Sequence, residues 1–295
     1  MVKMKKGVGE IIFDIFNYIF LGLLCFTFLY PMLYVLFASF SNPIKLMAYR
    51  GPLLRPLDFS VEAYKLLLSY PMIWIGYRNT IIYVVFGTAI NILLTTMGGY
   101  VLSRRNLKLK NPIMFFIAFT MYFSGGMIPT YLLVQSLGMI DTIWAMIIPG
   151  AISTTNLIIM RTGFHSVPDS LEESARIDGA GDWTILFRIM IPLAMPMIAV
   201  MILFYAVGHW NAFFNAIIYL RSRDLYPLQL VLREILIMNS TENMTTGISD
   251  ASDRFAITEL IKYAAIIVAT VPILCIYPFL QKYFVKGVMI GAIKE

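Results

Sequence analysis

Residues 79–102 read NTIIYVVFGTAINILLTTMGGYVL, a run of 24 residues that contains no Asp, Glu, Lys or Arg. A helix needs roughly 20 consecutive apolar residues to cross the hydrocarbon core of a bilayer, and this run is long enough to do so. It is apolar around its whole circumference, as expected of a helix that other helices or lipid cover on every side. The run therefore predicts a membrane-spanning helix.

Five more charge-free apolar runs lie on either side of this one. They are Tyr18–Phe40, Pro112–Val134, Ile143–Met160, Pro192–Leu220 and Tyr263–Leu280. Helices are expected for all of them, because every backbone polar group in hydrocarbon has to be satisfied within the spanning structure. The fold class expected is all-α, an integral membrane protein with six transmembrane helices.

Composition agrees with this reading of the runs. Of 295 residues, 59% are apolar and 14% are charged, with a mean hydropathy of +0.76, so a secreted disulfide scaffold, a disordered chain and an ordinary cytosolic enzyme are excluded. Cys25 and Cys275 each lie inside an apolar run and are expected to be small buried hydrophobes. The net charge of +6 comes from Lys and Arg at the ends of the runs, which indicates topology and no nucleic-acid partner.

The short loops predict the orientation. The loop between the second and third runs carries Arg104, Arg105, Lys108 and Lys110, whereas the loop between the third and fourth has no Lys or Arg. Because basic loops stay in the cytoplasm, both termini are expected there. The expected domains are residues 1–72 (tail, first span and external loop), 73–284 (a five-helix core) and 285–295 (a cytoplasmic tail).

The cytoplasmic loop between the fourth and fifth runs, residues 166–192, reads SVPDSLEESARIDGAGDWTILFRIMIP. Asp169 and Glu172 stand at capping-box spacing after Pro168, so a helix is expected to begin here. Gly179 and Gly181 should end it, and Asp182 should cap a second short helix. Such a pair of helices could transmit force from a cytoplasmic partner, or could be a surface connector that has none.

The same loop resembles a known family. Glu173-Ser174-Ala175, then Gly179, then Ile189-x-Ile191-Pro192 is similar to the EAA loop of ATP-binding-cassette (ABC) importer permeases, E-A-A, three residues, G, nine residues, I-x-L-P. Ser174 replaces the middle alanine and Ile191 the leucine, both mild changes of size. Residues 210–213 and 281–294 resemble carbohydrate permeases of the maltose (MalG-like) type, and VMIG at 288–291 is more similar to the LplC/YtcP-like branch.

The resemblance implies a type I importer (MetI-like) permease in the bacterial cytoplasmic membrane, with carbohydrate, most simply oligosaccharide, as cargo. It implies four kinds of partner: a homologous second permease, two cytoplasmic ATPase subunits, an extracytoplasmic solute-binding protein of the lipoprotein kind, and membrane lipid. The residues that it and the surrounding acids nominate for coupling to the ATPase are Glu172, Glu173, Ala175, Asp178, Gly179, Ile189 and Pro192.

No phosphate-binding loop of the form G-x-x-x-x-G-K-[ST] occurs in the sequence. The chain is therefore expected to be a non-catalytic subunit without a cofactor or metal of its own, and ATP and Mg²⁺ are expected on the partner ATPase.

A sugar pathway needs hydrogen-bonding groups and flat aromatic faces in a largely dry cavity. The candidates are Tyr205, His209, Trp210, Asn211 and Asn215, with the two asparagines on one helical face at i, i+4. Polar groups in spans also hold helices to one another, and that reading stands beside the pathway reading for each residue.

Two alternative functions stay open. The first is an ABC permease for a different solute, such as a peptide, polyamine or phosphonate. The second is an ion-coupled carrier that works alone, which the absence of Asp, Glu, Lys and Arg from the six runs disfavours.

Overall fold

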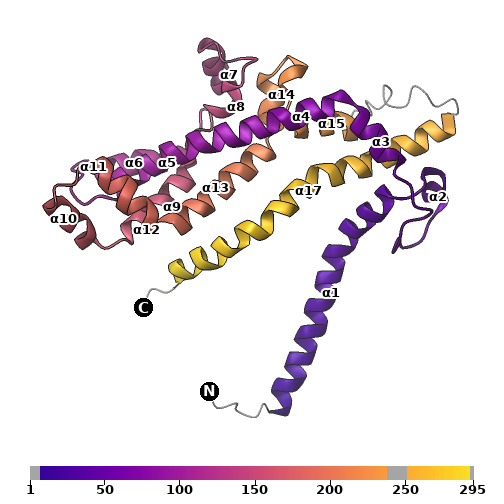
Figure 1. Ribbon diagram of the computed structural model, residues 1–295, viewed down its shortest axis with the longest axis horizontal. Coiled ribbons are helices and arrows are strands. Elements are labelled where there is room, and N and C mark those ends of the chain that lie inside the picture. Colours follow the sequence, from indigo (N-terminus) through magenta and orange to yellow (C-terminus); the bar gives the residue numbers. More distant parts are fainter. Residues whose placement is uncertain (1–6, 238–250, 293–295) are drawn as a thin grey trace. The chain divides into compact units, whose positions relative to one another are not determined.

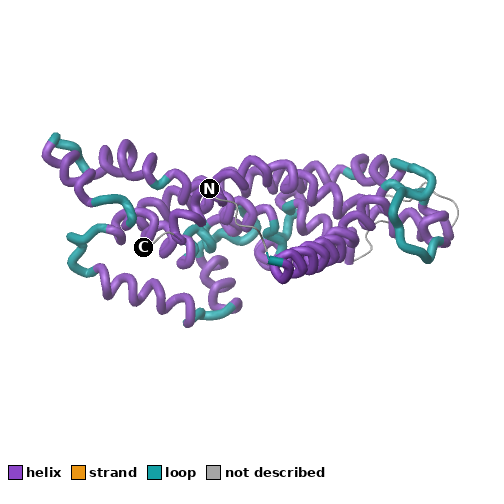
Figure 2. Tube along the Cα trace, turned by 90° about the horizontal axis from the view of Figure 1, so that it is seen from below, coloured by secondary structure: helices purple, strands orange, loops and turns teal. Residues whose placement is uncertain are grey.

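The computed structural model describes residues 7–237 and 251–292, and every regular element within those ranges is a helix (Figure 2). The chain divides into two compact units, residues 1–70 with 234–270 and residues 71–233 with 271–295. Each unit is described by itself.

The first unit contains an exposed apolar helix, α1 (Val8–Ser39). The helices of this unit are α1, α2 (Pro43–Ala48), α3 (Glu62–Ser69) and the first part of α17 (Ala251–Ala292). The most apolar stretch of α1 buries none of its residues within the chain, as expected of a helix that lipid or another subunit covers. The predicted span Tyr18–Phe40 lies almost wholly within α1 and is confirmed as a helix of sufficient length.

The segment after α1, predicted to be an external loop, forms two short helices that are held by a helix cap and by a contact between two hydroxyl groups. Asn42 caps α2, because its Oδ1 accepts from the backbone N of Ile44 at 3.1 Å and of Lys45 at 3.3 Å. The hydroxyl oxygens of Ser39 and Tyr64 lie 2.7 Å apart and connect the end of α1 with α3.

The second unit is built on one long helix, which contains the predicted span at residues 79–102. It comprises α4 (Pro71–Ile82), the π-helical turn η1 (Tyr83–Gly87) and α5 (Thr88–Ser103), which follow one another without a break. α9 (Thr154–His165) and α13 (Met195–Trp210) pack against it (Figure 1). The predicted span is confirmed, and the helix extends it at its N-terminal end.

The third and fourth predicted spans are not straight helices. α6 (Lys110–Tyr122) and α7 (Met127–Ser136) meet at 114°, and Gly126 in the break has a φ of +87°. Ile143–Met160 divides into α8 (Trp144–Ile147) and α9, because Pro149 and Gly150 interrupt the backbone pattern between them. A continuous helix over 143–160 is therefore a wrong prediction.

The fifth predicted span is interrupted at both ends. Before α13, the chain forms α11 (Asp182–Thr184), the π-helical η2 (Ile185–Met190) and α12 (Ile191–Leu193), which together meet α13 at 83°. α13 ends at Trp210, and α14 (Phe214–Tyr219) starts after a break. The prediction that Asn211 and Asn215 share one helical face is wrong, because residues 211–213 are not helical.

The spans counted by length and composition number three, or up to five if each bent pair crosses once. Tyr263–Leu280 lies within α17, the longest helix that the structure describes. Neither the count of six nor the position of the termini is confirmed, and both stay predictions. Cys25 and Cys275 are free thiols but are exposed on this chain, so the prediction that they are buried is wrong for the chain alone.

The main core of the second unit lies where α5, α9, η2 and α13 meet. Its buried members are Tyr100, Met160, Phe164, Ala175, Ile185, Leu186, Met190, Ala194, Ile198 and Met201. η3 (Arg223–Leu225) and α15 (Leu228–Ile237) follow α14. α10 (Asp169–Ile177) and α11 lie at one end of the unit, away from α14 (Figure 1). Because four of the core residues, from Ala175 to Met190, belong to the loop at residues 166–192, this core directly supports the loop.

Candidate coupling surface and polar helix contacts

The helix predicted within the loop exists, but its N-terminal cap differs from the prediction. α10 begins at Asp169, and no side chain caps its first turn. The Asp169 carboxylate instead lies 2.8 Å from Nε of Arg105, at the end of the preceding basic loop. The predicted capping box between Asp169 and Glu172 is therefore wrong: the Asp169 carboxylate pairs with Arg105, and the Glu172 carboxylate pairs with Arg104 and with Arg176 of the same helix.

The glycine break after α10 is confirmed in detail. The backbone N of Ala180 donates to the carbonyl O of Ala175 at 2.9 Å, and Gly179 N donates to Arg176 O at 3.0 Å. This pair of bonds is a Schellman motif, in which the residue after the C-cap adopts a left-handed conformation. Gly179 occupies that position with a φ of +82°, which explains why glycine stands there.

The second helix starts at Asp182, but Asp182 does not cap it. Gly181 is the N-cap residue, and no side-chain hydrogen bond closes this end. The Asp182 carboxylate accepts from Nη2 of Arg176 at 2.6 Å, across the glycine turn. Hydrogen bonds from Arg176 to the carboxylates of Glu172 and Asp182 raise the pKa of this guanidinium above its ordinary value. Asp182 thus joins the two helices where a cap was predicted.

An apolar surface with acidic neighbours faces outward from the two helices. Ile177 is 86% exposed and Trp183 62% exposed, and the indole of Trp183 stacks on Phe187 with ring centroids 6.0 Å apart. Exposed aromatic side chains of this kind are enriched in protein–protein interfaces. We call this the knuckle surface and define it by Leu171, Glu173, Ile177, Asp178, Trp183 and Phe187.

The seven residues nominated for coupling divide between two environments. Glu173, Asp178, Gly179 and Pro192 are exposed, whereas Ala175 is buried in the core and Ile189 packs against it. The Glu172 side chain is only 14% exposed, because its carboxylate pairs with Arg104 and Arg176. Glu172 therefore points inward. The role of all seven toward an ATPase stays a prediction.

Two of the five residues nominated for a pathway are hydrogen-bonded to neighbouring helices. The Tyr205 hydroxyl lies 2.7 Å from Oγ1 of Thr95 and accepts from the backbone N of Ser153 at 3.0 Å. Nε2 of His209 lies 2.7 Å from Oδ1 of Asn91. The polar groups of Tyr205 and His209 thus connect α13 with α5 and with the break before α9.

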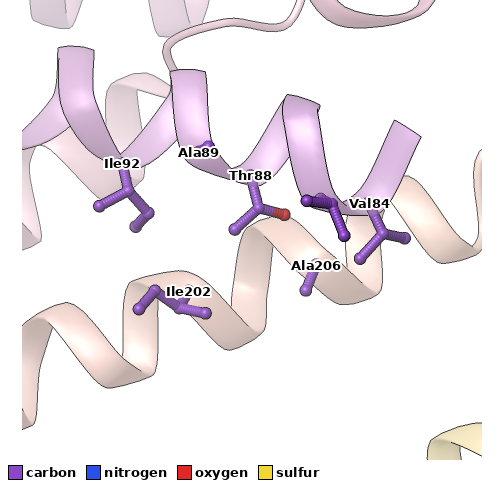
Figure 3. A pocket seen from close by; sticks show the side chains of 7 residues that line it. Val84, Thr88, Ala89, Ile92, Ile202 and Ala206 are labelled. Carbon is purple, nitrogen blue, oxygen red and sulfur yellow. The ribbon is translucent and has the colours of Figure 1, made fainter. Parts of the chain in front are cut away.

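The grooves beside α13 are mainly apolar. In Figure 3, the side chains of Thr88 and Ile92 face Ile202 and Ala206 across a groove of about 340 Å³ between η1–α5 and α13. A larger groove has a volume of about 630 Å³. Of the five residues nominated for the pathway, only Trp210 lines it. Its other walls are Val84, Thr155, Asn156, Leu203, Phe204, Ala206, Val207, Ile273, Ile276 and Tyr277.

Sequence reasoning missed several residues of these sites. The contribution of α17 to the larger groove, through Ile273, Ile276 and Tyr277, has no sequence signal, because those residues resemble any other lipid-facing residues. The sequence pattern marks Arg104 only as a topology signal and gives no sign of its partly buried pairing with Glu172. Among the described residues, no group of three or more His, Cys, Asp or Glu is placed to hold a metal ion.

Comparisons with known proteins agree over most of the chain. Residues 94–290 match the family described as "Binding-protein-dependent transport system inner membrane component". The polygalacturonan/rhamnogalacturonan transport system permease protein YtcP of Bacillus subtilis (strain 168) is 42% identical over 96% of this chain and 98% of its own length. Protein LplC of the same organism is also 42% identical, over 96% of this chain and 95% of LplC.

One solved structure is similar to this chain in both fold and sequence. It is a crystal structure of a bacterial ABC transporter involved in the import of the acidic polysaccharide alginate. The matched chain superposes with a TM-score of 0.88 and is 33% identical, and the match covers 96% of this chain and all of the other.

Proposed function

The chain belongs to the family of inner membrane components of binding-protein-dependent transport systems, and from that premise we propose that it forms half of an oligosaccharide pathway and couples to an ATPase through the knuckle surface. As a member of this family, it is a non-catalytic permease subunit of an ABC importer and a multi-pass protein of the cytoplasmic membrane.

Membership of the family implies a solute-binding protein, an ATPase and a second permease. In our proposal the second permease is homologous to this chain, two ATPase subunits carry ATP and Mg²⁺, and the binding protein is an external lipoprotein. We propose that the nucleotide binds to the ATPase and not to this chain, whose sequence contains no phosphate-binding loop.

The single observation that carries the coupling proposal is the geometry of the knuckle surface. The Schellman turn at Gly179 and the core beneath Ala175 hold α10 and α11 in a fixed relation, while Ile177 and Trp183 project away from the chain. Exposed apolar and aromatic groups on a rigid support match what an interface needs, because little side-chain or loop entropy is lost when the partner binds.

The proposed cargo is an oligosaccharide derived from an acidic polysaccharide. Two similar proteins at or above 33% identity carry names that refer to polygalacturonan, rhamnogalacturonan or alginate. The groove beside Trp210 offers aromatic and amide groups in an apolar wall, a lining that suits sugar rings. The alternative with a specific basis is a neutral oligosaccharide, because arabinooligosaccharide permeases are similar at 26% identity.

The cargo is tested with the complete importer, purified with its partners and reconstituted in proteoliposomes. We expect ATP hydrolysis stimulated by the binding protein, and uptake, with oligogalacturonate or alginate oligosaccharide. Arabinooligosaccharide and maltooligosaccharide serve as neutral comparisons. Stimulation by a neutral sugar alone would reject the acidic cargo but keep the sugar importer. Stimulation by none of the four would count against carbohydrate import.

The coupling surface is tested by one pair of substitutions. Ile177→Asp places a charge at the centre of the knuckle surface, and we expect the ATPase subunits to be lost when the complex is purified through the permease. Leu109→Asp is the matched control, because Leu109 is also exposed and lies in the other predicted cytoplasmic loop. Equal retention of the ATPase in both variants would contradict the assignment.

A further inference from the structure

Arg104 lies directly after α5 and contacts three elements at once. It pairs through Nη1 with the Glu172 carboxylate of α10, and its Nη2 donates to the carbonyl O of Phe164 in α9 at 3.3 Å. The same nitrogen donates to Oγ of Ser103 at 2.8 Å, and the guanidinium carbon lies 4.9 Å from the centroid of the Tyr100 ring. A planar, forked cation is required for this set of contacts, which an ammonium group could not make.

The pair between Arg104 and Glu172 is sheltered from solvent. The two side chains are 15% and 14% exposed, whereas the neighbouring pair of Arg105 and Asp169 is 75% and 35% exposed. Ion pairs on a surface contribute little, but removing one partner of a sheltered pair leaves a charge without compensation. The two pairs join the same segments of chain and differ mainly in shelter.

The ionic contacts continue from Glu172 across the glycine turn. The Glu172 carboxylate also accepts from Nη2 and Nε of Arg176, at 2.9 and 3.2 Å. Nη2 of Arg176 in turn donates to Asp182 of α11 at 2.6 Å. Arg104, Glu172, Arg176 and Asp182 thus form one row of alternating charge, which we call the brace. It runs from the end of α5 to the start of the second short helix.

We propose that Arg104 is a positioning residue for coupling, and that the brace carries movement of the knuckle surface to the long helix of α4, η1 and α5. The inference rests on the proposed function. The chain itself connects α10 to α13 through η2, α12 and the bend before α13, which is one route by which α10 could act on the spans. The brace supplies a second and direct route, to a helix that packs closely against α9: a Cβ on Gly99 would lie 2.8 Å from Cγ of Met160.

The test uses the complete importer in proteoliposomes, with oligogalacturonate as the probe and with ATP hydrolysis and uptake measured together. Arg104→Gln and Glu172→Gln are expected to raise the ATP consumed per sugar imported by about five- to tenfold, a usual size for coupling between sites. The matched control is Arg105→Gln, which breaks the exposed pair beside the brace and should leave that ratio unchanged.

A structural role and a coupling role give different results in this design. Loss of folding reduces the amount of assembled complex, whereas loss of coupling changes the ratio in complexes that do assemble. If the Gln variants do not assemble, Arg104→Lys supplies the test, since it keeps the charge but loses the fork, and its ratio should also rise. A wild-type ratio in Arg104→Lys, or an equal rise in Arg105→Gln, overturns the proposal.

The control with the unchanged importer separates the two proposals. If the wild-type complex hydrolyses ATP but imports neither oligogalacturonate nor the other sugars, the proposed function fails before the brace is tested. If the wild type imports the probe and the brace variants retain its ratio, only the positioning role of Arg104 fails.

Discussion

Nε2 of His209 on α13 lies 2.7 Å from Oδ1 of Asn91 on α5. The Asn91 amide nitrogen also donates to the carbonyl O of Gly150 at 3.0 Å and of Ala151 at 2.7 Å. Because the amide nitrogen is fully used as a donor, Oδ1 is the acceptor and Nε2 carries the proton. One fully buried asparagine thus joins α5, α13 and the break between α8 and α9.

Asn91→Ala should therefore reduce stability and leave cargo recognition unchanged. Three hydrogen bonds are lost and two backbone carbonyls are left without this donor, which costs about 1–3 kcal/mol. Thermal unfolding of the purified complex would show a lower midpoint, and uptake by the complexes that remain folded would keep its apparent affinity. A weaker affinity at an unchanged unfolding temperature would instead place Asn91 in the pathway.

Thr95 and Thr96 form a matched pair on the same helix. The Thr95 hydroxyl lies 2.7 Å from the Tyr205 hydroxyl, whereas the equally buried Thr96 hydroxyl has no hydrogen-bond partner within the described parts of the chain. Thr95→Val should destabilise the complex by about 1 kcal/mol, because it leaves the tyrosine without that partner. Thr96→Val should be neutral or stabilising, because it removes a buried polar group that lacks a partner. Equal effects on the unfolding midpoint would contradict this assignment.

The features that the sequence predicted well are local ones. The run at 79–102 is recognisable because charges are absent over the whole length of a span, and the turn at Gly179 because a glycine follows a helical pattern. Both depend on residues close together in the chain, where spacing and residue type determine the backbone.

The features that were missed depend on contacts over long separations. Arg104 and Glu172 are 68 residues apart, and a basic loop has the same sequence pattern whether its arginines face water or a partly buried carboxylate. The break at 211–213 contains no Gly or Pro, so its local pattern continues the helix. These outcomes are decided by packing between elements, which periodicity does not report.

Gly98 and Gly99 lie on α5 where it packs against α9, and Gly99 leaves less room for a side chain than Gly98. A Cβ on Gly99 would lie 2.8 Å from Cγ of Met160 and 3.2 Å from the backbone N of Arg161, whereas one on Gly98 would meet only the end of the Leu157 side chain, at 3.0 Å. Gly99→Ala should therefore lower stability by about 1–3 kcal/mol, because backbone cannot move aside as a side-chain terminus can. Gly98→Ala should have a much smaller effect on the same unfolding midpoint. The reverse order would contradict the packing described for these helices.

Asp141 lies outside the predicted spans, and its carboxyl group should make the stability of the fold depend on pH. Its carboxylate accepts from the Ser222 hydroxyl and from the backbone N of Ser222 and Arg221, and these bonds, the hydroxyl first, hold its pKa below the ordinary 3.8. A carboxyl with a lowered pKa stabilises the fold above its unfolded pKa and loses that contribution as the pH falls through the folded value. The difference in unfolding midpoint between wild type and Asp141→Ala should thus be full at neutral pH and should shrink below about 3.8.

Asp141→Asn is the control for that titration. Asparagine keeps an acceptor oxygen and tolerates the positive φ of 61° at this position, so it should lose less stability than alanine. Because its side chain does not titrate, the residual difference from alanine should not change with pH. A difference between Asn and Ala that falls with pH would show that another group titrates.

Gly179 and Gly181 separate backbone strain from bulk at the knuckle surface. A Cβ would meet nothing within 4 Å at either position, so crowding within the chain is equal. Only Gly179 has a positive φ, +82°, where an L-residue costs roughly 1–2 kcal/mol, whereas Gly181 is extended. Gly179→Val should therefore disturb the Schellman turn and reduce the sugar imported per ATP hydrolysed, while Gly181→Val should leave the turn intact. Gly179→Asn, which tolerates this conformation, should import an amount of sugar per ATP that lies between those of the two valine variants.

Wild-type uptake in Gly179→Val would show that the turn does not set the coupling geometry. Equal loss in both valine variants would show that bulk at the ATPase interface is the cause.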